Sequence, residues 1–303
     1  MVFVVAESNE IACAAVELIQ IEYDPIPAMV EVMDALRPGS QSIWETAPDN
    51  IAYRFAKGEK EEVRKAITDA HYVAELEIKN NRVMAAPLEP RAGLSFYDAK
   101  TDTMYLSCTA QGVHAIRDQL AYDVFNVPPE KIKVSAPDIG GGFGLKNFLF
   151  PEWVLLLWAS KKLGRPIKWV AERSEDNSSA LHGRDITTDA KLALDKDGNF
   201  LALEADLTAN MGAYLSAGGP NASTNAASTA MGGVYNIPCV FMSSKGVFTN
   251  TTPVDAYRGA GKPEANFIIE RLIDIAASQF NFDPVELLSL IHISEPTRLG
   301  MIS

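Results

Sequence analysis

The chain has 303 residues, 47% of them hydrophobic, which is enough to bury one large core or two smaller ones. Its formal net charge of −12 argues against nucleic-acid binding, because no basic stripe is present to neutralise phosphates. No run of about 18 apolar residues occurs, and the first residues lack the charged region and cleavage site of a signal peptide, so we expect a cytoplasmic protein.

The cysteines bear on redox chemistry. Cys13, Cys108 and Cys239 are scattered along the chain and odd in number, so they form neither a disulfide framework nor a C-x-x-C metal or cluster motif. Any iron–sulfur centre is therefore expected on another chain.

The first hundred residues alternate between short elements and proline-rich turns. The pattern predicts a strand over 2–5, helices over 10–21 and 59–70, and strands over 72–98. The last stretch is interrupted by Ala86-Pro-Leu-Glu-Pro90. Glu89, which stands between the two prolines, is a candidate functional carboxylate, although a corner that fixes the chain direction is the favoured interpretation.

Gln111 lies where a strand gives way to a helix. The strand covers 104–107, and a helix follows with Val113, Ile116, Leu120 and Val124 on one face. From this junction the Gln111 amide can point into a cleft, although a capping or surface role is the ordinary alternative. His114 has no second ligand at metal spacing, so we interpret it as structural.

A glycine-rich loop, Asp138-Ile-Gly-Gly-Gly-Phe-Gly-Leu-Lys146, connects a predicted strand over 132–135 to a helix that opens near Pro151. Glycines permit positive φ angles and close approach, and free backbone N–H groups before a helix favour an anion. The dinucleotide and P-loop spacings both fail at Leu145. A tight turn that packs strand on helix remains the alternative.

The middle of the chain predicts a buried helix over 152–163, apolar nearly all round, and a strand over 168–171. A hairpin follows, with strands over 186–194 and 200–207 joined by Asp195-Lys-Asp-Gly198. The Gly/Ala/Ser/Asn-rich stretch ending at Gly233 is expected to be a packed loop, because two further short strands follow it closely.

A second glycine loop, Asp255-Ala-Tyr-Arg-Gly-Ala-Gly-Lys-Pro-Glu264, precedes a helix that Pro263 opens. It presents Arg258, as the first loop presents Phe143. Backbone donors combined with a fixed guanidinium suit an anionic, phosphate-bearing cofactor.

These motifs together resemble the large subunit of the molybdenum hydroxylases, the xanthine dehydrogenase, aldehyde oxidase and carbon-monoxide dehydrogenase group. Gly140-Gly-Gly-Phe-Gly144 is similar to that family's cofactor loop, and Ala256-Tyr-Arg-Gly-Ala-Gly261 to its active-site loop. Thr109-Ala-Gln111 is similar to the element that supplies a glutamine near the metal. The likeness covers nearly all of residues 1–287 and includes the order and separation of the motifs.

The resemblance implies an oxo-molybdenum centre held by molybdopterin or its cytosine dinucleotide form, with no direct protein ligand to the metal. Gln111 would donate to the apical oxo group, Arg258 would fix the active-site loop, and the cofactor contacts would include Gly141, Gly142, Phe143 and Gly144. The implied reaction is hydroxylation with water as the oxygen source. Electrons would leave through 2Fe-2S and FAD groups on partner subunits, in a dimer of heterotrimers.

Departures from the family pattern narrow the expected substrate. Asn147 stands where purine-oxidising members carry a glutamate, and Ala260 stands where they carry a substrate-stacking phenylalanine. Gly259 replaces the cysteine that anchors copper in the carbon-monoxide members. Gly259 thus leaves copper without an anchor, and Asn147 and Ala260 predict a roomier, uncharged pocket. The expected substrate is an aldehyde or an N-heteroaromatic molecule.

The expected fold class is α+β. We expect a truncated hammerhead-like domain and linker over 1–60, and an incomplete first molybdopterin-binding domain over 61–287 with mixed sheets and outer helices. Residues 288–303, including His292 and Arg298, resemble a translated sequencing adapter and are treated as an artefact. The general-base glutamate of the family would lie in a missing half, so the chain is expected to be an inactive fragment. Exposed apolar surface is expected where that half would dock, near Trp153 or Trp158.

Two alternatives stay open. One is a binding or scaffold subunit that keeps the fold without the cofactor, in which alanine at Gln111, Phe143 or Arg258 would be tolerated. The other is a nucleotide-dependent dehydrogenase, which the failed loop spacings disfavour.

Overall fold

The computed structural model describes residues 2–291 and divides the chain into two compact units, each discontinuous in sequence. Unit 1 combines residues 2–28 with 84–180, and unit 2 combines residues 29–83 with those from 181 onward. Residue 60 lies within unit 2, so the compact units do not follow the boundary expected there, and the domain assignment remains a prediction.

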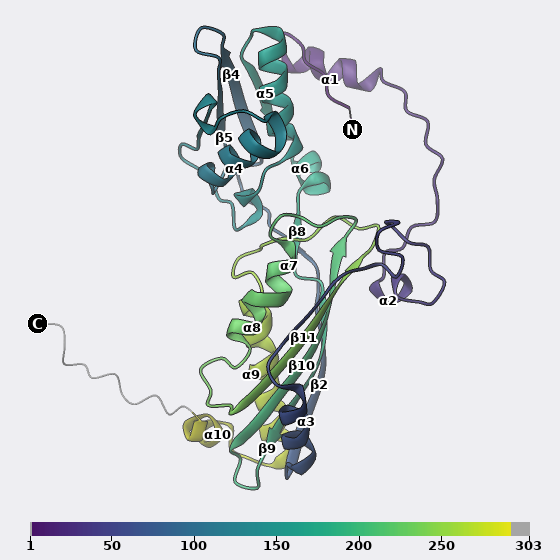
Figure 1. The fold of residues 1–303 in the computed structure, drawn as a ribbon, viewed down its shortest axis with the longest axis vertical. Helices are drawn as coiled ribbons and strands as arrows, with labels where there is room; N and C mark the ends of the chain where they lie inside the picture. The colour runs from purple at the N-terminus through teal and green to yellow at the C-terminus, as the bar shows by residue number, and fades with distance from the viewer. Residues whose placement is uncertain (1, 292–303) are drawn as a thin grey trace, which may run out of the picture. The chain divides into compact units, whose positions relative to one another are not determined.

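Unit 1 is built on a four-stranded sheet with strand order β6-β5-β4-β7. Figure 1 labels its strands β4 and β5. Strand β4 pairs antiparallel with β5 and β7, and β5 pairs parallel with β6. The elements are α1 (Asn9–Glu17), β4 (Ala92–Asp98), β5 (Thr103–Cys108), α4 (Val113–Gln119), the π-helical η1 (Leu120–Phe125), the 3-10 turn η2 (Pro129–Lys131), β6 (Ile132–Ser135), the 3-10 turn η3 (Leu145–Asn147), α5 (Pro151–Leu163), β7 (Ile167–Val170) and α6 (Arg173–Ser179).

Helix α5 packs against β4 and gives unit 1 its core (Figure 1). Pro151 opens the helix, and Gly164 ends it in the left-handed region at φ 64°. Ser95 of β4 donates to the Leu156 carbonyl at 2.7 Å. Trp153 is fully buried, whereas Trp158 is 47% exposed, so the prediction of a helix buried all round is wrong on the Trp158 side.

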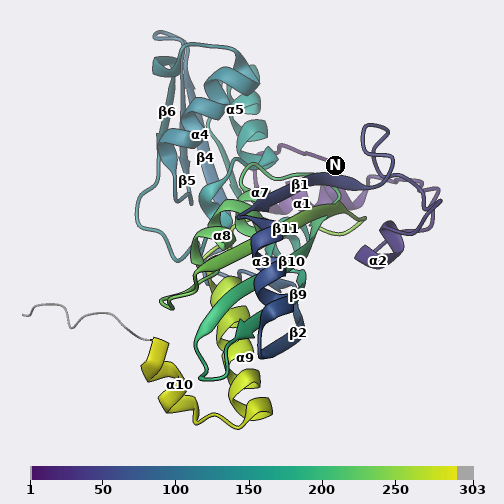
Figure 2. The same cartoon turned by 60° about the horizontal axis from the view of Figure 1, so that its bottom comes forward.

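Unit 2 is built on a five-stranded mixed sheet with order β1-β11-β10-β9-β2, in which only β10 and β11 pair in parallel (Figure 2). The elements are α2 (Val32–Ala35), β1 (Ile51–Lys57), α3 (Lys60–Asp69), β2 (Tyr72–Asn80), β8 (His182–Gly183), β9 (Ile186–Leu194), β10 (Phe200–Gly212), α7 (Gly219–Asn221), the π-helical η4 (Ala222–Ala226), α8 (Ala227–Ala230), β11 (Cys239–Phe248), α9 (Lys262–Phe280) and α10 (Pro284–Ile291). Strand β3 (Val83–Met84) pairs with β8 in a separate two-stranded sheet.

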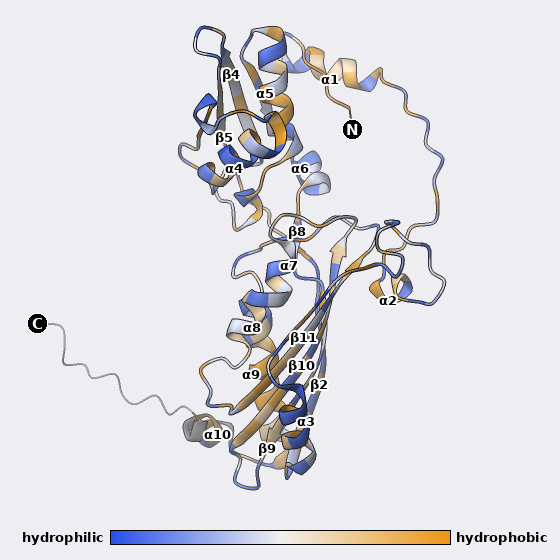
Figure 3. Cartoon of the chain, in the orientation of Figure 1, coloured by the Kyte–Doolittle hydropathy of each residue, from blue (hydrophilic) through white to orange (hydrophobic). Residues whose placement is uncertain are grey.

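The core of unit 2 lies between this sheet and α9. Alternate residues of the strands face α9, so that Leu192 and Leu203 pack in one cluster with Ile268 and Leu272. Their sequence neighbours Ala193 and Ala202 face the other side and pack with Val63 of α3. In Figure 3, α3 is largely hydrophilic, whereas the strands of this sheet carry many hydrophobic residues. The α+β class with mixed sheets and outer helices is confirmed.

Several local predictions are confirmed and others are wrong. The hairpin appears as β9 and β10, with Asp195 Oδ1 accepting from the Asn199 N–H at 2.9 Å across the turn. Residues 2–5 form no strand, because no neighbouring strand pairs with them, and α1 ends at Glu17. The stretch expected to be a loop before Gly233 contains the short helices α7, η4 and α8, and the two strands expected after it are the single strand β11.

The proposed artefact over 288–303 begins inside α10, and its residues 292–303 lie outside the described part of the chain. Within residues 2–291, no helix is both long enough and apolar enough to cross a membrane.

Candidate functional site

The Gln111 side chain is oriented by a backbone donor of the first glycine loop. Gln111 follows β5, and its backbone N–H donates to the Lys146 carbonyl at 2.8 Å. Its side-chain Oε1 accepts from the Gly144 N–H at 2.9 Å. Because an N–H donates only to the oxygen, the amide Nε2 is directed elsewhere, and it makes no hydrogen bond to any of residues 2–291. The exposed Gln111 amide therefore offers donors to a ligand.

The loop itself requires its glycines. Gly141 and Gly144 have φ values of 97° and 98°, and Phe143 between them also lies in the left-handed region at 53°. A Cβ at Gly142 would lie 2.5 Å from Cδ of Gln111. Within the described chain, the backbone N–H groups of Gly141, Gly142 and Phe143 donate to no protein acceptor. Successive free donors on a turn of this kind can bind an anion.

Glu89 and Lys146 hold the start of this loop. Lys146 is fully buried, and its Nζ donates to the Glu89 carbonyl at 2.8 Å and to Glu89 Oε2 at 3.1 Å. The same Oε2 accepts from the Gly140 N–H at 2.8 Å. Burial alone would raise the pKa of Glu89, but the hydrogen bonds from Gly140 and Lys146 outweigh it and lower that pKa.

Asn147 completes the group in unit 1. It is exposed, and a Cβ at Gly112, the residue after Gln111, would lie 2.9 Å from Asn147 Oδ1. The structure thus brings together Gln111, Asn147 and the loop residues Gly141, Gly142, Phe143 and Gly144. The other predicted residues, Arg258, Gly259 and Ala260, lie in unit 2.

The second glycine loop is also strained and closely packed. Gly259, Ala260 and Gly261 all have positive φ values, of 97°, 46° and 91°. A Cβ at Gly261 would overlap the Ala222 carbonyl oxygen and lie 2.8 Å from its carbon, so only glycine fits. Arg258 is exposed, and its guanidinium makes no ion pair or hydrogen bond to the residues that the structure describes.

Arg184, which the sequence analysis missed, holds this loop. Its guanidinium donates to the carbonyls of Tyr257 at 3.1 Å and Arg258 at 2.9 Å, and pairs with the buried Glu264 at 2.9 Å. Arg184 and Asp185 are both left-handed, at φ 65° and 63°. The signal in the sequence is only the short Leu181-His-Gly-Arg-Asp185 stretch before the hairpin, and nothing there indicates a partner more than seventy residues away.

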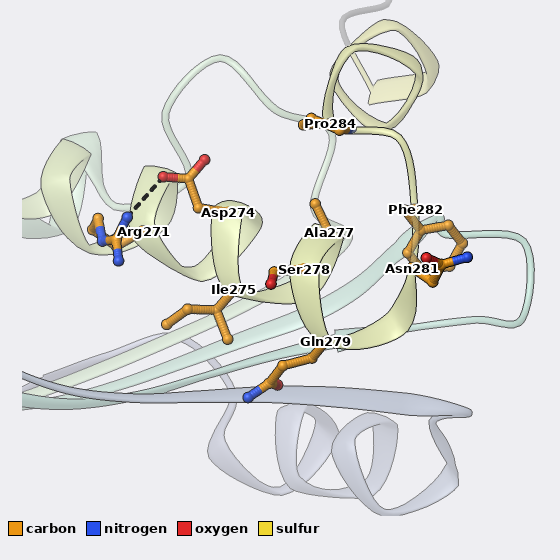
Figure 4. A pocket seen from close by; sticks show the side chains of 9 residues that line it. All are labelled: Arg271, Asp274, Ile275, Ala277, Ser278, Gln279, Asn281, Phe282 and Pro284. Carbon is orange, nitrogen blue, oxygen red and sulfur yellow. Dashed lines mark hydrogen bonds and ion pairs between the residues drawn. The ribbon is translucent and has the colours of Figure 1, made fainter.

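A cavity of about 710 Å³ lies elsewhere in unit 2, along the last turns of α9 and the start of α10 (Figure 4). None of the predicted site residues lines it. Its charged lining residues among those described, Arg271 and Asp274, pair with each other at 2.9 Å (Figure 4). The cavity therefore offers no free cation to an anionic ligand. Across residues 2–291, no three His, Cys, Asp or Glu side chains are placed to hold a metal ion.

Comparisons with known proteins agree on one family. The model of a molybdopterin cofactor-binding domain matches residues 43–290. The chain is 32% identical over 286 residues to the gamma subunit of the 6-hydroxypseudooxynicotine dehydrogenase complex of Paenarthrobacter nicotinovorans, a match covering 94% of this chain and 35% of that protein. It is 31% identical to the carbon monoxide dehydrogenase large chain of Hydrogenophaga pseudoflava, covering 94% and 37%.

Solved structures give the same result. Quinoline 2-oxidoreductase from Pseudomonas putida 86 superposes with a TM-score of 0.87 at 32% identity, covering 97% of this chain and 38% of that one. Carbon monoxide dehydrogenase from Oligotropha carboxidovorans superposes with a TM-score of 0.89 at 29% identity, covering 95% and 38%. The chain thus spans little more than a third of each of these four proteins.

Proposed function

The chain belongs to the molybdopterin cofactor-binding domain family, and on that premise we propose that its two glycine-rich loops contact the cofactor of a molybdenum-dependent hydroxylase. The observation that carries the proposal is the Gln111 amide. Because the Gly144 N–H donates to its oxygen, the NH₂ group remains available as a donor. The activity belongs to the whole protein, of which this chain supplies the residues described above.

The residues fit a polyanionic cofactor. The first loop offers the free N–H groups of Gly141, Gly142 and Phe143, and a side chain at Gly142 would collide with Gln111. The nearby carboxylate of Glu89 is neutralised by Lys146 at 3.1 Å, so it does not repel an anion. In unit 2, the Arg184 guanidinium donates to two carbonyls of the second loop. The Arg258 guanidinium is therefore not needed to hold that loop and can bind an anionic group.

In this proposal, Gln111, the first loop and Arg258 each contact the cofactor or position a loop against it. Gln111 donates to the cofactor through Nε2, and Gly141 to Gly144 contact it through the backbone. Arg258 fixes the second loop against it. The cofactor, as molybdopterin or its cytosine dinucleotide form, supplies the two-electron chemistry that converts a substrate C–H bond to C–OH with water as the oxygen source. No residue of this chain is assigned as the general base.

The proposed substrate is an aldehyde or an N-heteroaromatic molecule. Asn147, Gly259 and Ala260 place no charge and no large side chain at the positions assigned to the substrate pocket. The names of several relatives support the N-heteroaromatic choice, among them nicotine 6-hydroxylase and quinoline 2-oxidoreductase. We also propose a cytoplasmic assembly with an iron–sulfur subunit and an FAD subunit, as a dimer of heterotrimers. The relatives described as a complex subunit and a large chain support an assembly of several subunits.

The test is cofactor content. The whole protein, purified with its partners from cells grown with molybdate, is analysed for molybdenum by mass spectrometry and for pterin by fluorescence after oxidation. The proposal predicts both in stoichiometric amounts. A preparation that contains neither would overturn it and favour a cofactor-free scaffold subunit, in which Gln111→Ala, Phe143→Ala and Arg258→Ala leave the activity of the assembly unchanged.

A further inference from the structure

Glu89 and Lys146 connect the first glycine loop to the proline corner at 86–90 and to Gln111. The Lys146 ammonium binds Glu89, and the Glu89 carboxylate binds the Gly140 N–H, with distances of 3.1 Å and 2.8 Å. The backbone carbonyl of the same lysine accepts the Gln111 N–H at 2.8 Å. The two residues together therefore link the proline corner, the first glycine of the loop and the backbone of Gln111.

We propose that Glu89 and Lys146 form a clamp that positions the glycine loop and Gln111 for the cofactor, and this inference rests on the proposed function. The clamp takes up the N–H of Gly140 and leaves those of Gly141, Gly142 and Phe143 for the ligand. The contact is close, because a Cβ at Gly140 would lie 2.6 Å from the Glu89 Cβ. Glu89 and Lys146 are thus positioning residues that act through the loop.

The charges of Glu89 and Lys146 explain why an ion pair is suited to hold a loop that binds an anion. A carboxylate binds a backbone N–H more strongly than a neutral acceptor does, but beside an anion it would be repulsive. Lys146 cancels that charge and has no exposed surface, so solvent does not compete for it. A lone buried ammonium would be costly, so Lys146 requires Glu89 as its partner.

The first part of the test measures loop opening in the 303-residue chain by hydrogen exchange of the peptide covering 138–146. Loss of the carboxylate bonds in Glu89→Ala is expected to speed that exchange roughly tenfold to a hundredfold. Glu89→Gln keeps an acceptor for the Gly140 N–H and is expected to restore part of the protection. The control is Glu152→Ala, which breaks the pair with the buried Arg91 in the same unit. Among residues 2–291, the Glu152 side chain makes no hydrogen bond or ion pair to the loop.

The second part measures how fast molybdenum dissociates from the whole protein carrying the same variants. Faster dissociation in Glu89→Ala, partial rescue in Glu89→Gln and wild-type behaviour in Glu152→Ala would support the clamp. Unchanged loop exchange in both Glu89 variants, or an opened loop that retains molybdenum as the wild type does, would overturn it. If Glu89→Ala does not fold, Glu89→Gln carries the comparison.

The failure of the clamp and the failure of the proposed function are distinguishable. A wild-type protein without molybdenum overturns the proposed function, and with it the role of the clamp toward a cofactor. Unchanged loop exchange in variants of a molybdenum-loaded protein overturns the clamp alone.

Discussion

The Gln111 amide oxygen accepts a hydrogen bond from Gly144, whereas its NH₂ group has no partner among residues 2–291. A substitution can change the NH₂ group and keep the oxygen. In Gln111→Glu one oxygen can still accept from the Gly144 N–H, but the other end becomes an anion in place of a donor. We expect the whole protein carrying this substitution to lose most of its molybdenum, while the melting temperature of the 303-residue chain stays close to that of the wild type. Metal analysis and calorimetry measure the two quantities.

The matched control for that prediction is Gln119→Glu at the end of α4, in the same unit but away from the loop. It adds the same charge and should leave the molybdenum content unchanged. Equal molybdenum in Gln111→Glu and Gln119→Glu would count against the assigned role of Gln111.

Arg91 is a buried cation with no role assigned in the candidate site. It has no exposed surface, pairs with Asp176 at 2.7 Å and Glu152 at 3.2 Å, and lies 4.2 Å from the centre of the Phe150 ring. Arg91→Met would leave Glu152 without its partner and Asp176 with only the more distant Arg173 at 3.7 Å. We therefore expect the free energy of unfolding to fall by about 3–5 kcal/mol in urea titrations. The exposed pair of Arg117 and Asp118 in the same unit gives the control, because Arg117→Met should cost under about 1 kcal/mol. Equal losses in the two variants would show that burial does not strengthen the Arg91 cluster.

Burial raises the pKa of the Cys108 thiol to about 12. An unfolded cysteine ionises near pH 8.5, roughly, so the contribution of the protonated thiol to stability is complete below that pH and is lost as the pH rises toward the folded value. At pH 8 we expect iodoacetamide to modify the exposed Cys13 in the folded chain and Cys108 only in denaturant, as peptide mass analysis would show. Modification of both at one rate would contradict the buried, protonated state.

Residue-level prediction from sequence succeeded where the signal is local. The placement of Gln111 between a strand and a helix is confirmed by β5 and α4, which the apolar spacing already indicates. Arg184 could not be predicted, because its partners Tyr257 and Arg258 come from a distant loop. The same holds for Lys146, whose burial depends on the corner at Glu89 and not on its own surroundings in the sequence.

The start of helix α9 depends on Gly261, which caps it with a positive φ. Gly261→Ala would place a Cβ on the Ala222 carbonyl, whereas Gly164→Ala at the end of α5 would meet nothing within 4 Å. Both substitutions carry the left-handed penalty of about 1 kcal/mol. We expect only Gly261→Ala to lose substantially more, because its backbone neighbours cannot move aside. Urea unfolding of the two variants measures the difference, and similar losses would mean that the second loop is not closely packed.

The predictions of helices and strands are correct where the sequence pattern is long, and wrong where strand pairing decides whether a strand forms. Helices α3, α5 and α9 and the hairpin of β9 and β10 carry clear periodicity or turn residues, and all are present. The failure at residues 2–5 has a physical cause, because a β-branched run forms a strand only when a neighbour supplies hydrogen bonds. Helix α6 was missed because Arg173–Ser179 is polar and short.

The organisation into two discontinuous units is a property of the whole chain. The sheet of unit 2 joins β1 and β2 from the first eighty residues to β9, β10 and β11, which lie beyond the whole of unit 1. Local patterns in a sequence indicate strands but not which distant strands pair, so this arrangement could not be read from periodicity. The family resemblance supplied the α+β class, and the structure supplied the topology.

The location of molybdenum in the whole protein tests the central claim most directly. Anomalous diffraction at the molybdenum absorption edge would place the metal in an experimental crystal structure. The account predicts a bound cofactor that is lined by residues 141–144 and accepts a hydrogen bond from the amide nitrogen of Gln111. Molybdenum bound where neither Gln111 nor this loop touches the cofactor, or a crystal without molybdenum, would contradict it.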